Sequence, residues 1–490
     1  MKRLLAIAIL LAACDKKPLD HARPETPRPA PAGTEPQTAA SGERAAAPAG
    51  DPCSKAHTWS NEVMPWITDD LPSALACAKQ RKVPVVLDLW APWCHTCLSM
   101  QSTVFTDPSF KSDVDRFVFA ALDTDKEINA EAVGKYPPSA WPTFYVIGTD
   151  QSTGRSDAVL ARFVGAASLA QFHTFLDAGL RAQQGGAAGA DAHLLGAERA
   201  ISVKDLATGE QELAAALAQA PADWARRPDA LTSLIQTRHR RKDLTGCIEV
   251  AEKSMDDTGN AAAATDFVVQ AMLCSEDLKD PAYAGRIKKL REHAAARLSK
   301  LIADREAPLS VDDRSDAMAN LREVLDALGR SAEARAVAET QRALLDDAAA
   351  KASTPMARMT YNWQRCDVYA YLGKPLEMVP ALEQSAKDLP GEYDPRARLG
   401  WIYLKAGKLP EATKWTDEAL RMVYGPRKAR LLAQRAEIAI AQHDKATERR
   451  IREETVKLWE NMPAGQANPE ALAKAKEALA ALDAPATARK

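Results

Sequence analysis

The chain has 490 residues, which is too long for a single hydrophobic core and predicts two or three domains. Its 64 Lys and Arg residues nearly balance its 66 Asp and Glu residues, so no global excess of positive charge favours nucleic-acid binding. We therefore expect no nucleic-acid partner.

The N-terminus has the pattern of an export signal. A basic start at residues 1–3 precedes an apolar stretch at residues 4–13, which is too short to span a membrane and is typical of a secretory signal peptide. Residues 11–14 read Leu-Ala-Ala-Cys and resemble a bacterial lipobox. The resemblance implies that residues 1–13 are a signal peptide and that Cys14 carries a lipid anchor. It places the protein in the bacterial cell envelope, facing the periplasm, and leaves inner and outer membrane as alternatives.

Two segments are expected to be flexible. Residues 14–50 are rich in Pro and Ala with almost no large apolar side chain, and such a segment cannot bury enough surface to offset its ordering entropy. Residues 183–192 are rich in Gly and Ala. We interpret the first segment as a disordered tether and the second as a linker.

Residues 51–182, between these two segments, have the pattern of a small α/β domain. A helical pattern at residues 71–79 precedes an apolar run at 85–89, which leads directly into Cys94-His95-Thr96-Cys97 and a second helix. Further strands are expected at 117–123, 141–147 and 159–165, with helices at 128–134 and 169–180. This order predicts a mixed sheet flanked by helices.

The Cys-x-x-Cys motif carries the chemistry. A buried strand that ends just before Cys94 places this cysteine at a helix N-terminus, where unpaired N–H groups and the helix dipole favour a thiolate. We interpret Cys94 as a nucleophile and Cys97 as its resolving partner. The alternative, a structural zinc site, needs four ligands, and the sequence has no second Cys-x-x-Cys or paired His/Cys cluster. We therefore expect no metal and no other cofactor.

Motifs occur at three separated points of this domain: Asp88, Trp90, Ala91, Trp93, Cys94 and Cys97, then Trp141-Pro142-Thr143, then Val164-Gly165-Ala166. Together they resemble the thioredoxin fold, and the approach to the dithiol most resembles the thioredoxin-like domain of periplasmic DsbD-type disulfide reductases.

This resemblance implies roles for further residues. Asp88 becomes a buried carboxyl that accepts a proton from Cys97, with its pKa raised by desolvation. Pro142 becomes a cis-proline facing Cys94. The expected substrate-binding residues are Trp93, His95, Trp141, Pro142 and Thr143. Trp141 is bulkier than the residue usual at its position, and His95 either stabilises the Cys94 thiolate or faces solvent with little effect.

The remaining cysteines permit two structural disulfides. An oxidising compartment favours pairing, so Cys53 and Cys77 are expected to form a disulfide, with a buried free Cys77 as the alternative. Cys247 and Cys274 lie on expected neighbouring helices, which permits a second disulfide without requiring one.

Residues 193–490 are expected to be entirely helical because helix-forming residues dominate them. Gly373 and Gly407 each end a helix-turn pattern, and their spacing is the 34-residue period of the tetratricopeptide repeat, which this region resembles. The resemblance implies a right-handed α-solenoid whose concave face binds a protein partner.

The whole chain is thus predicted to be multidomain, α/β followed by all-α. We interpret it as a membrane-anchored, exported thiol–disulfide oxidoreductase, favoured as a reductase of protein disulfides that draws electrons from a thiol donor. The alternative is a scaffold with an idle dithiol that assembles a cell-envelope complex through its solenoid.

Overall fold

The computed structural model describes residues 51–58, 63–151 and 153–483. The predicted signal peptide, the lipidated Cys14 and the 14–50 tether lie outside the described residues. Within the described part, no helix combines the length and the apolar character that crossing a membrane requires.

The predicted mixed sheet is confirmed, with one strand that the sequence pattern did not indicate. Five strands lie in the order β1-β3-β2-β4-β5. Strands β1, β3 and β2 are parallel to one another, β4 is antiparallel to β2, and β5 is antiparallel to β4. Their bounds are β1 (Trp66–Thr68), β2 (Val85–Trp90), β3 (Val118–Asp123), β4 (Thr143–Asp150) and β5 (Arg155–Val164). The unpredicted strand is β1, at the sheet edge beside β3.

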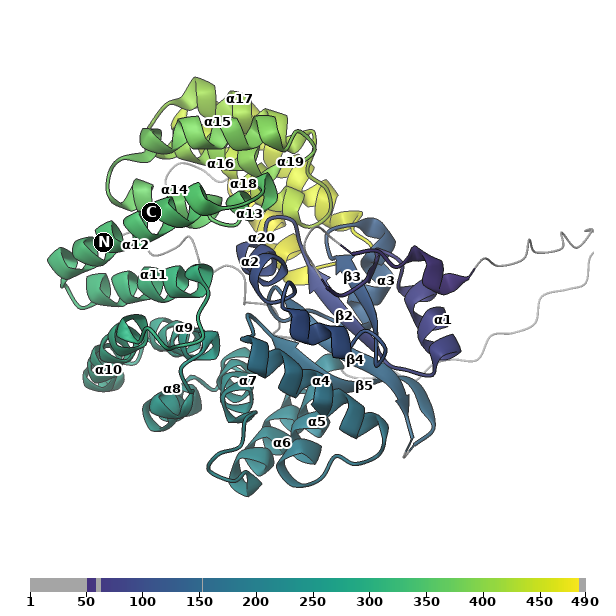
Figure 1. Cartoon of the computed structure of the whole chain (residues 1–490). Helices are drawn as coiled ribbons and strands as arrows, with labels where there is room; N and C mark the ends of the chain where they lie inside the picture. Colours follow the sequence, from purple (N-terminus) through teal and green to yellow (C-terminus); the bar gives the residue numbers. More distant parts are fainter. Residues whose placement is uncertain (1–50, 59–62, 152, 484–490) are drawn as a thin grey trace, which may run out of the picture.

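Four helices cover the two faces of this sheet (Figure 1). They are α1 (Leu71–Arg81), α2 (His95–Thr103), α3 (Ala130–Lys135) and α4 (Leu169–Gln183), and short 3-10 helices lie at η2 (Pro52–Lys55), η3 (Pro108–Ser112) and η4 (Glu127–Asn129). Val86 packs in a core rich in phenylalanine with residues of α2 and α4, whereas Val85 and Leu87 pack with residues of α1. Both faces of β2 are therefore buried, which explains its continuous apolar run.

A long helical array follows the sheet domain. Its elements are α5 (Gly189–Ser202), α6 (Leu206–Gln219), α7 (Arg227–Arg240), α8 (Leu244–Ser254), η5 (Met255–Asp257), α9 (Ala262–Asp277), η6 (Pro281–Tyr283), α10 (Ala284–Ala303), α11 (Val311–Ala327), α12 (Ser331–Lys351), α13 (Pro355–Met359), α14 (Asn362–Tyr371), η7 (Pro375–Met378), α15 (Val379–Asp388), α16 (Asp394–Lys405), α17 (Leu409–Leu420), α18 (Arg427–Ala441), α19 (Lys445–Glu460) and α20 (Pro469–Ala480). Successive helices pack as pairs, such as α11 with α12 and α16 with α17.

Glycines end several of these helices. Gly373 and Gly407 have φ of 78° and 71°, a backbone conformation that glycine adopts without the steric penalty other residues incur, as in a helix C-terminal turn. The repeat seen in the sequence is therefore a repeat of helix-terminating turns. The expected linker at 183–192 is shorter than predicted, because α4 ends at Gln183 and α5 begins at Gly189.

The array curves around the sheet domain and contacts it at several places (Figure 1). Helix α5 packs on β5, α11 and α13 pack on α2, and Gln466 near the end of the array donates hydrogen bonds to the carbonyls of Thr124 and Lys126. The face expected to bind a separate protein partner is thus in contact with the chain's own first domain.

Two disulfides outside the Cys-x-x-Cys motif are present in the structure. One joins Cys53 in η2 to Cys77 in α1, with Cα atoms 5.0 Å apart. The other joins Cys247 in α8 to Cys274 in α9, with Cα atoms 6.2 Å apart. Each ties together two neighbouring elements.

Candidate redox site

The site is built on the start of α2. Cys94 is the N-cap residue of this helix, and its Sγ accepts a hydrogen bond from the backbone N–H of Cys97 at 3.0 Å. The two cysteines form a disulfide, with exposed fractions of only 4% and 2%. In the reduced protein the same N–H group and the helix dipole would stabilise a thiolate on Cys94.

A buried carboxyl lies in the strand that leads to the dithiol. Asp88 is 1% exposed and occupies the centre of β2, between Ala121 of β3 and Phe144 of β4. Alternation along the strand puts it on the same face as Val86, which is the face covered by α2. Within the described residues its Oδ1 has no hydrogen-bond partner, and burial raises the pKa of its carboxyl well above the ordinary value. Such a group can take up a proton near neutral pH.

Trp141 packs against the cluster formed by Ala91, Cys94 and Cys97, and Pro142 follows it in the chain. The peptide bond between Trp141 and Pro142 is cis, and the carbonyl of Pro142 accepts a hydrogen bond from the N–H of Gly165 at 2.9 Å. Nε1 of Trp141 donates to Oγ1 of Thr124 at 2.7 Å. Thr143 donates from its own hydroxyl to the carbonyl of Ala140 at 2.6 Å, which fixes the turn before β4.

Trp93, the residue before Cys94, is held on three sides. Its ring meets that of Trp141 edge-on, with centroids 5.2 Å apart, and its Nε1 donates to Oδ2 of Asp125 at 2.7 Å. The guanidinium of Arg427, at the start of α18, lies 4.3 Å from the Trp93 ring centroid. Burial raises the pKa of Asp125 to about 7 and lowers that of Arg427 to about 10. The array therefore contributes a cation–π contact to the site.

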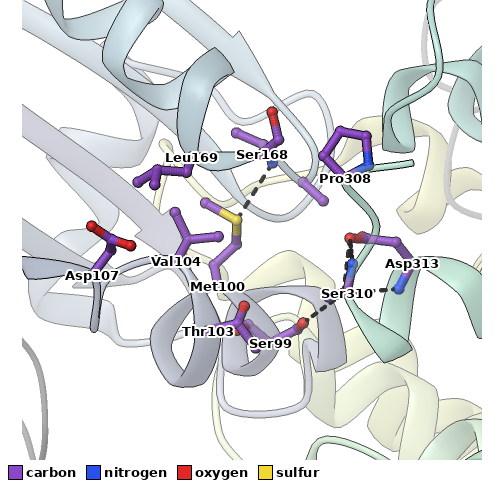
Figure 2. Close-up of a pocket in the computed structure, with 12 residues that line it drawn as sticks. Ser99, Met100, Thr103, Val104, Asp107, Ser168, Leu169, Pro308, Ser310 and Asp313 are labelled. Carbon is purple, nitrogen blue, oxygen red and sulfur yellow. Dashed lines mark hydrogen bonds between the residues drawn. The ribbon is translucent and has the colours of Figure 1, made fainter. Parts of the chain in front are cut away.

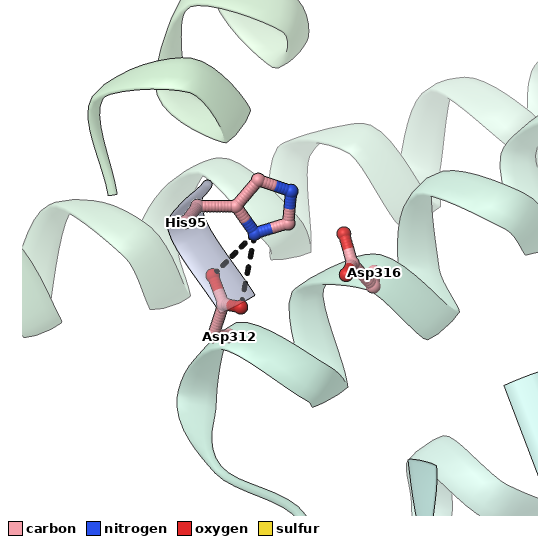
Figure 3. A group of neighbouring side chains, drawn as sticks. All are labelled: His95, Asp312 and Asp316. Carbon is pink, nitrogen blue, oxygen red and sulfur yellow. Dashed lines mark hydrogen bonds and ion pairs between the residues drawn. The ribbon is translucent and has the colours of Figure 1, made fainter. Parts of the chain in front are cut away.

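His95, the residue after Cys94, also meets the array (Figure 3). Its Nδ1 lies 3.0 Å from both carboxylate oxygens of Asp312 in α11, and its side chain is only 21% exposed. Burial alone would lower the pKa of His95, but the charges of Asp312 and Asp316 raise it to about 9. Neither expectation for His95 included an ion pair with the array.

Asp312 and Arg427 are the array residues at the site that sequence reasoning missed, and it also missed Asp125 of the first domain, which accepts a hydrogen bond from Trp93. Asp312 lies 217 residues after His95, and nothing in the local pattern around either array residue links it to the dithiol. His95, Asp312 and Asp316 bring three possible metal-ligand atoms within 4.8 Å of one another. Nδ1 of His95 is engaged by Asp312 in this arrangement.

A cavity of about 170 Å³ lies next to α2, between the two domains (Figure 2). Ser99 and Met100 of α2 line one side, and Pro308, Ser310 and Asp313 line the other. Oγ of Ser99 donates to Oγ of Ser310 at 3.1 Å across the boundary. The cavity thus adjoins a direct link between α2 and the segment that starts α11.

Residues 66–143 match the family model described as thioredoxin-like. This region is a thioredoxin-like domain. A 58-residue stretch is 36% identical to the thiol:disulfide interchange protein DsbD of Vibrio vulnificus strain CMCP6, and equally to that of strain YJ016. The match covers 12% of this chain and 10% of each relative, so the chain spans about a tenth of the length of the curated relatives it matches. These findings support thiol–disulfide oxidoreductase chemistry at the level of the family.

Solved structures similar to this chain include tetratricopeptide repeat proteins. The crystal structure of one from Parabacteroides merdae ATCC 43184 is 14% identical, covers 60% of this chain and 99% of that chain, and has a TM-score of 0.39. The P58(IPK) TPR domain is 15% identical, covers 61% of this chain and 99% of that chain, and has a TM-score of 0.14.

Proposed function

We propose that the protein is an exported, lipid-anchored thiol–disulfide oxidoreductase that reduces protein disulfides with electrons from a thiol donor. The observation that carries this proposal is Cys94 at the N-cap of α2, with its Sγ accepting the N–H of Cys97, inside a thioredoxin-like domain. Cys14 supplies the anchor in this proposal, and the helical array supplies contacts to a protein partner.

The reaction transfers two electrons in two exchange steps. The Cys94 thiolate attacks one sulfur of a substrate disulfide, the substrate S–S bond breaks, and the leaving sulfur departs as a thiolate that takes a proton from solvent. Cys97 then loses its proton to Asp88 and attacks Sγ of Cys94. The mixed disulfide breaks, the second substrate sulfur leaves, and the Cys94–Cys97 disulfide forms. A thiol donor reduces this disulfide by the same chemistry in reverse.

Insulin reduction tests the proposal. With dithiothreitol as donor, we expect the wild-type protein to accelerate insulin reduction and Cys94→Ser to lose that acceleration, because the nucleophile is gone. Cys366→Ala is the matched control, since Cys366 is a buried free cysteine in the array. Equal acceleration by wild type and Cys94→Ser would refute the mechanism.

The equilibrium potential of the Cys94/Cys97 couple against glutathione tests the direction of electron flow. A value near that of thioredoxin, about −270 mV, supports a reductase, whereas a value near about −120 mV indicates an oxidant.

A second candidate function is a scaffold with an idle dithiol. It is favoured by one observation: the array contacts both neighbours of Cys94, and Cys94 itself is only 4% exposed. Cys97→Ala separates the two functions, because an active nucleophile without its resolving partner accumulates a mixed disulfide with insulin. Absence of this adduct from the reduced, folded variant favours the scaffold.

A further inference from the structure

The two neighbours of Cys94 in the sequence are both held by the helical array. Arg427 of α18 covers Trp93, and Asp312 of α11 pairs with His95. The array therefore reaches the dithiol from two helices that lie far apart in the sequence.

We propose that the helical array completes the redox site and that Asp312 is a positioning residue, acting on Cys94 through the His95 imidazole. This inference rests on the proposed redox function and adds a second domain to its site.

The position of Asp312 is fixed by the start of α11. Ser310 is the N-cap of this helix and forms a capping box with Asp313, so the first turn, which carries Asp312, is well defined. Ser310 also accepts a hydrogen bond from Ser99 of α2. The first turn of α11 is therefore linked to the helix that carries the dithiol, and the side chain of Asp312 is fully buried there.

The orientation of the imidazole follows from this anchoring. Both carboxylate oxygens of Asp312 lie 3.0 Å from Nδ1 of His95, so Nδ1 carries a proton and points at α11. A ring held at one nitrogen cannot turn freely. Asp312 thus sets where the histidine charge lies relative to Cys94, one residue away.

The charges around His95 favour its cationic form. Asp312, Asp313 and Asp316 face it from α11, and Arg398 opposes them from α16. On α13, which also packs on α2, Arg358 is paired with Asp388. The carboxylates outweigh both burial and Arg398, since the pKa of His95 rises to about 9.

The histidine charge matters only in the reduced protein. Reduction adds two electrons and breaks the Cys94–Cys97 bond, leaving Cys94 as a thiolate and placing one proton on Cys97. An imidazolium next to Cys94 stabilises that thiolate without giving up its own proton. The equilibrium between disulfide and dithiol is then linked to the ionisation of His95, which Asp312 controls.

The test measures the equilibrium constant of the couple with glutathione from pH 6 to pH 10, corrected for the ionisation of the glutathione thiol, which itself titrates at about pH 8.5, together with the His95 imidazole titration by NMR. In the wild-type protein the equilibrium constant and the NMR titration should each show a break near pH 9, because the pKa of His95 is raised to about 9. Asp312→Asn should move both breaks to lower pH by about one unit or more, because a neutral amide no longer favours the imidazolium. Asp312→Glu keeps the negative charge and should leave both breaks much closer to their wild-type pH than Asp312→Asn does.

Asp326→Asn is the matched control, the same substitution on α11 at a residue that accepts a hydrogen bond from Tyr371. It should leave both breaks in place.

If Asp312→Asn fails to fold, His95→Gln serves instead and should abolish the break in the equilibrium constant. The inference is overturned if the histidine titration shifts while the redox equilibrium does not, or if the break survives in His95→Gln. Failure of the proposed function is a separate result, since wild type would then not reduce insulin whatever the pH profile of its couple.

Discussion

At the scale of single residues, Asp88 combines a chemical task with a cost to the fold. Its carboxyl is buried in the central part of the sheet, and within the described residues one of its oxygens has no hydrogen-bond partner. Removing a polar group from water without a partner is unfavourable. A proton acceptor behind the dithiol needs the raised pKa that this burial produces. The residue that serves exchange thus lowers the stability of the oxidised protein.

Asp88→Asn should stabilise the oxidised protein at neutral pH and slow insulin reduction. Because the folded state of the wild type binds the Asp88 proton more tightly than the unfolded state, its stability falls as pH rises from about 3.9 through the raised folded pKa. The advantage of the variant should therefore be absent near pH 3 and grow by up to about 1.4 kcal/mol per pH unit above pH 4.

Urea unfolding at a series of pH values measures this difference. Asp115→Asn is the control, since the Asp115 side chain is fully exposed. A stability difference that does not vary with pH would show that the Asp88 carboxyl titrates at its ordinary pKa.

At the scale of elements, the join between β5 and α5 depends on one buried ion pair. Glu198 of α5 accepts the backbone N–H of Arg162 in β5 at 3.0 Å and pairs with Arg226 at 2.9 Å. Arg226 in turn donates to the carbonyl of Arg162 at 3.0 Å and to Asp229 at 2.7 Å. Side chains of the array thus satisfy backbone groups on the edge strand of the sheet, which also protects that edge.

Glu198→Gln should lower the free energy of unfolding by about 2 kcal/mol, because Arg226 stays buried with one carboxylate fewer. Glu212→Gln on α6 is the comparison. Glu212 pairs with His193 at a position where both side chains are about one third exposed, so its loss should cost little. Denaturant unfolding of the three proteins gives the result, and equal stability of Glu198→Gln and wild type would show that the pair contributes nothing net.

Elements with a long regular pattern were predictable, and short ones were not. The run at Val85–Trp90 is buried on both faces, and its sequence predicts a strand without further information. Trp66–Thr68 has only three residues, too few for a periodic pattern, and it becomes a strand through its pairing with β3. Residues 189–192 have a linker composition but lie in α5, where Ala190 is buried. Packing there outweighs local propensity.

The candidate site was predictable only within its own domain. Cys94, Cys97 and Asp88 are recognisable because strand, dithiol and helix are adjacent in the sequence. The partner of His95 lies 217 residues away. Its identity depends on how the array curves, and no local spacing encodes that.

At the scale of the whole molecule, the array closes on the thioredoxin-like domain at its C-terminal end. Gly465, between α19 and α20, lies so close to α3 that a Cβ atom there would overlap the backbone carbonyl of Ala130. Tyr424, before α18, donates a hydrogen bond to Asp123. Gln466, which follows Gly465, donates a hydrogen bond to the carbonyl of Thr124. Asp125, the next residue, holds Trp93. The end of the array is therefore linked through residues 123–125 to Trp93, the residue before Cys94.

Gly465→Ala should loosen this contact and raise the alkylation rate of reduced Cys94 several-fold, because Cys94 is only 4% exposed while the array is docked. Gly285→Ala is the matched control, a helical glycine in α10 with open space around its Cβ position. Iodoacetamide labelling followed by mass spectrometry measures both rates. Equal rates in the two variants would mean that docking of the array end does not limit access to Cys94.

The hydrogen bond from Gln466 to Thr124 joins residues 342 positions apart, which has a consequence for biosynthesis. A ribosome adding about 5 to 20 residues per second needs about 20 to 70 s to make the intervening chain. The thioredoxin-like domain can fold as a unit before the last helices exist. Until α11 and α18 have been made and have docked, His95 lacks Asp312 and Trp93 lacks Arg427, so we expect Cys94 of an incomplete chain to react faster with thiol reagents than Cys94 of the complete chain.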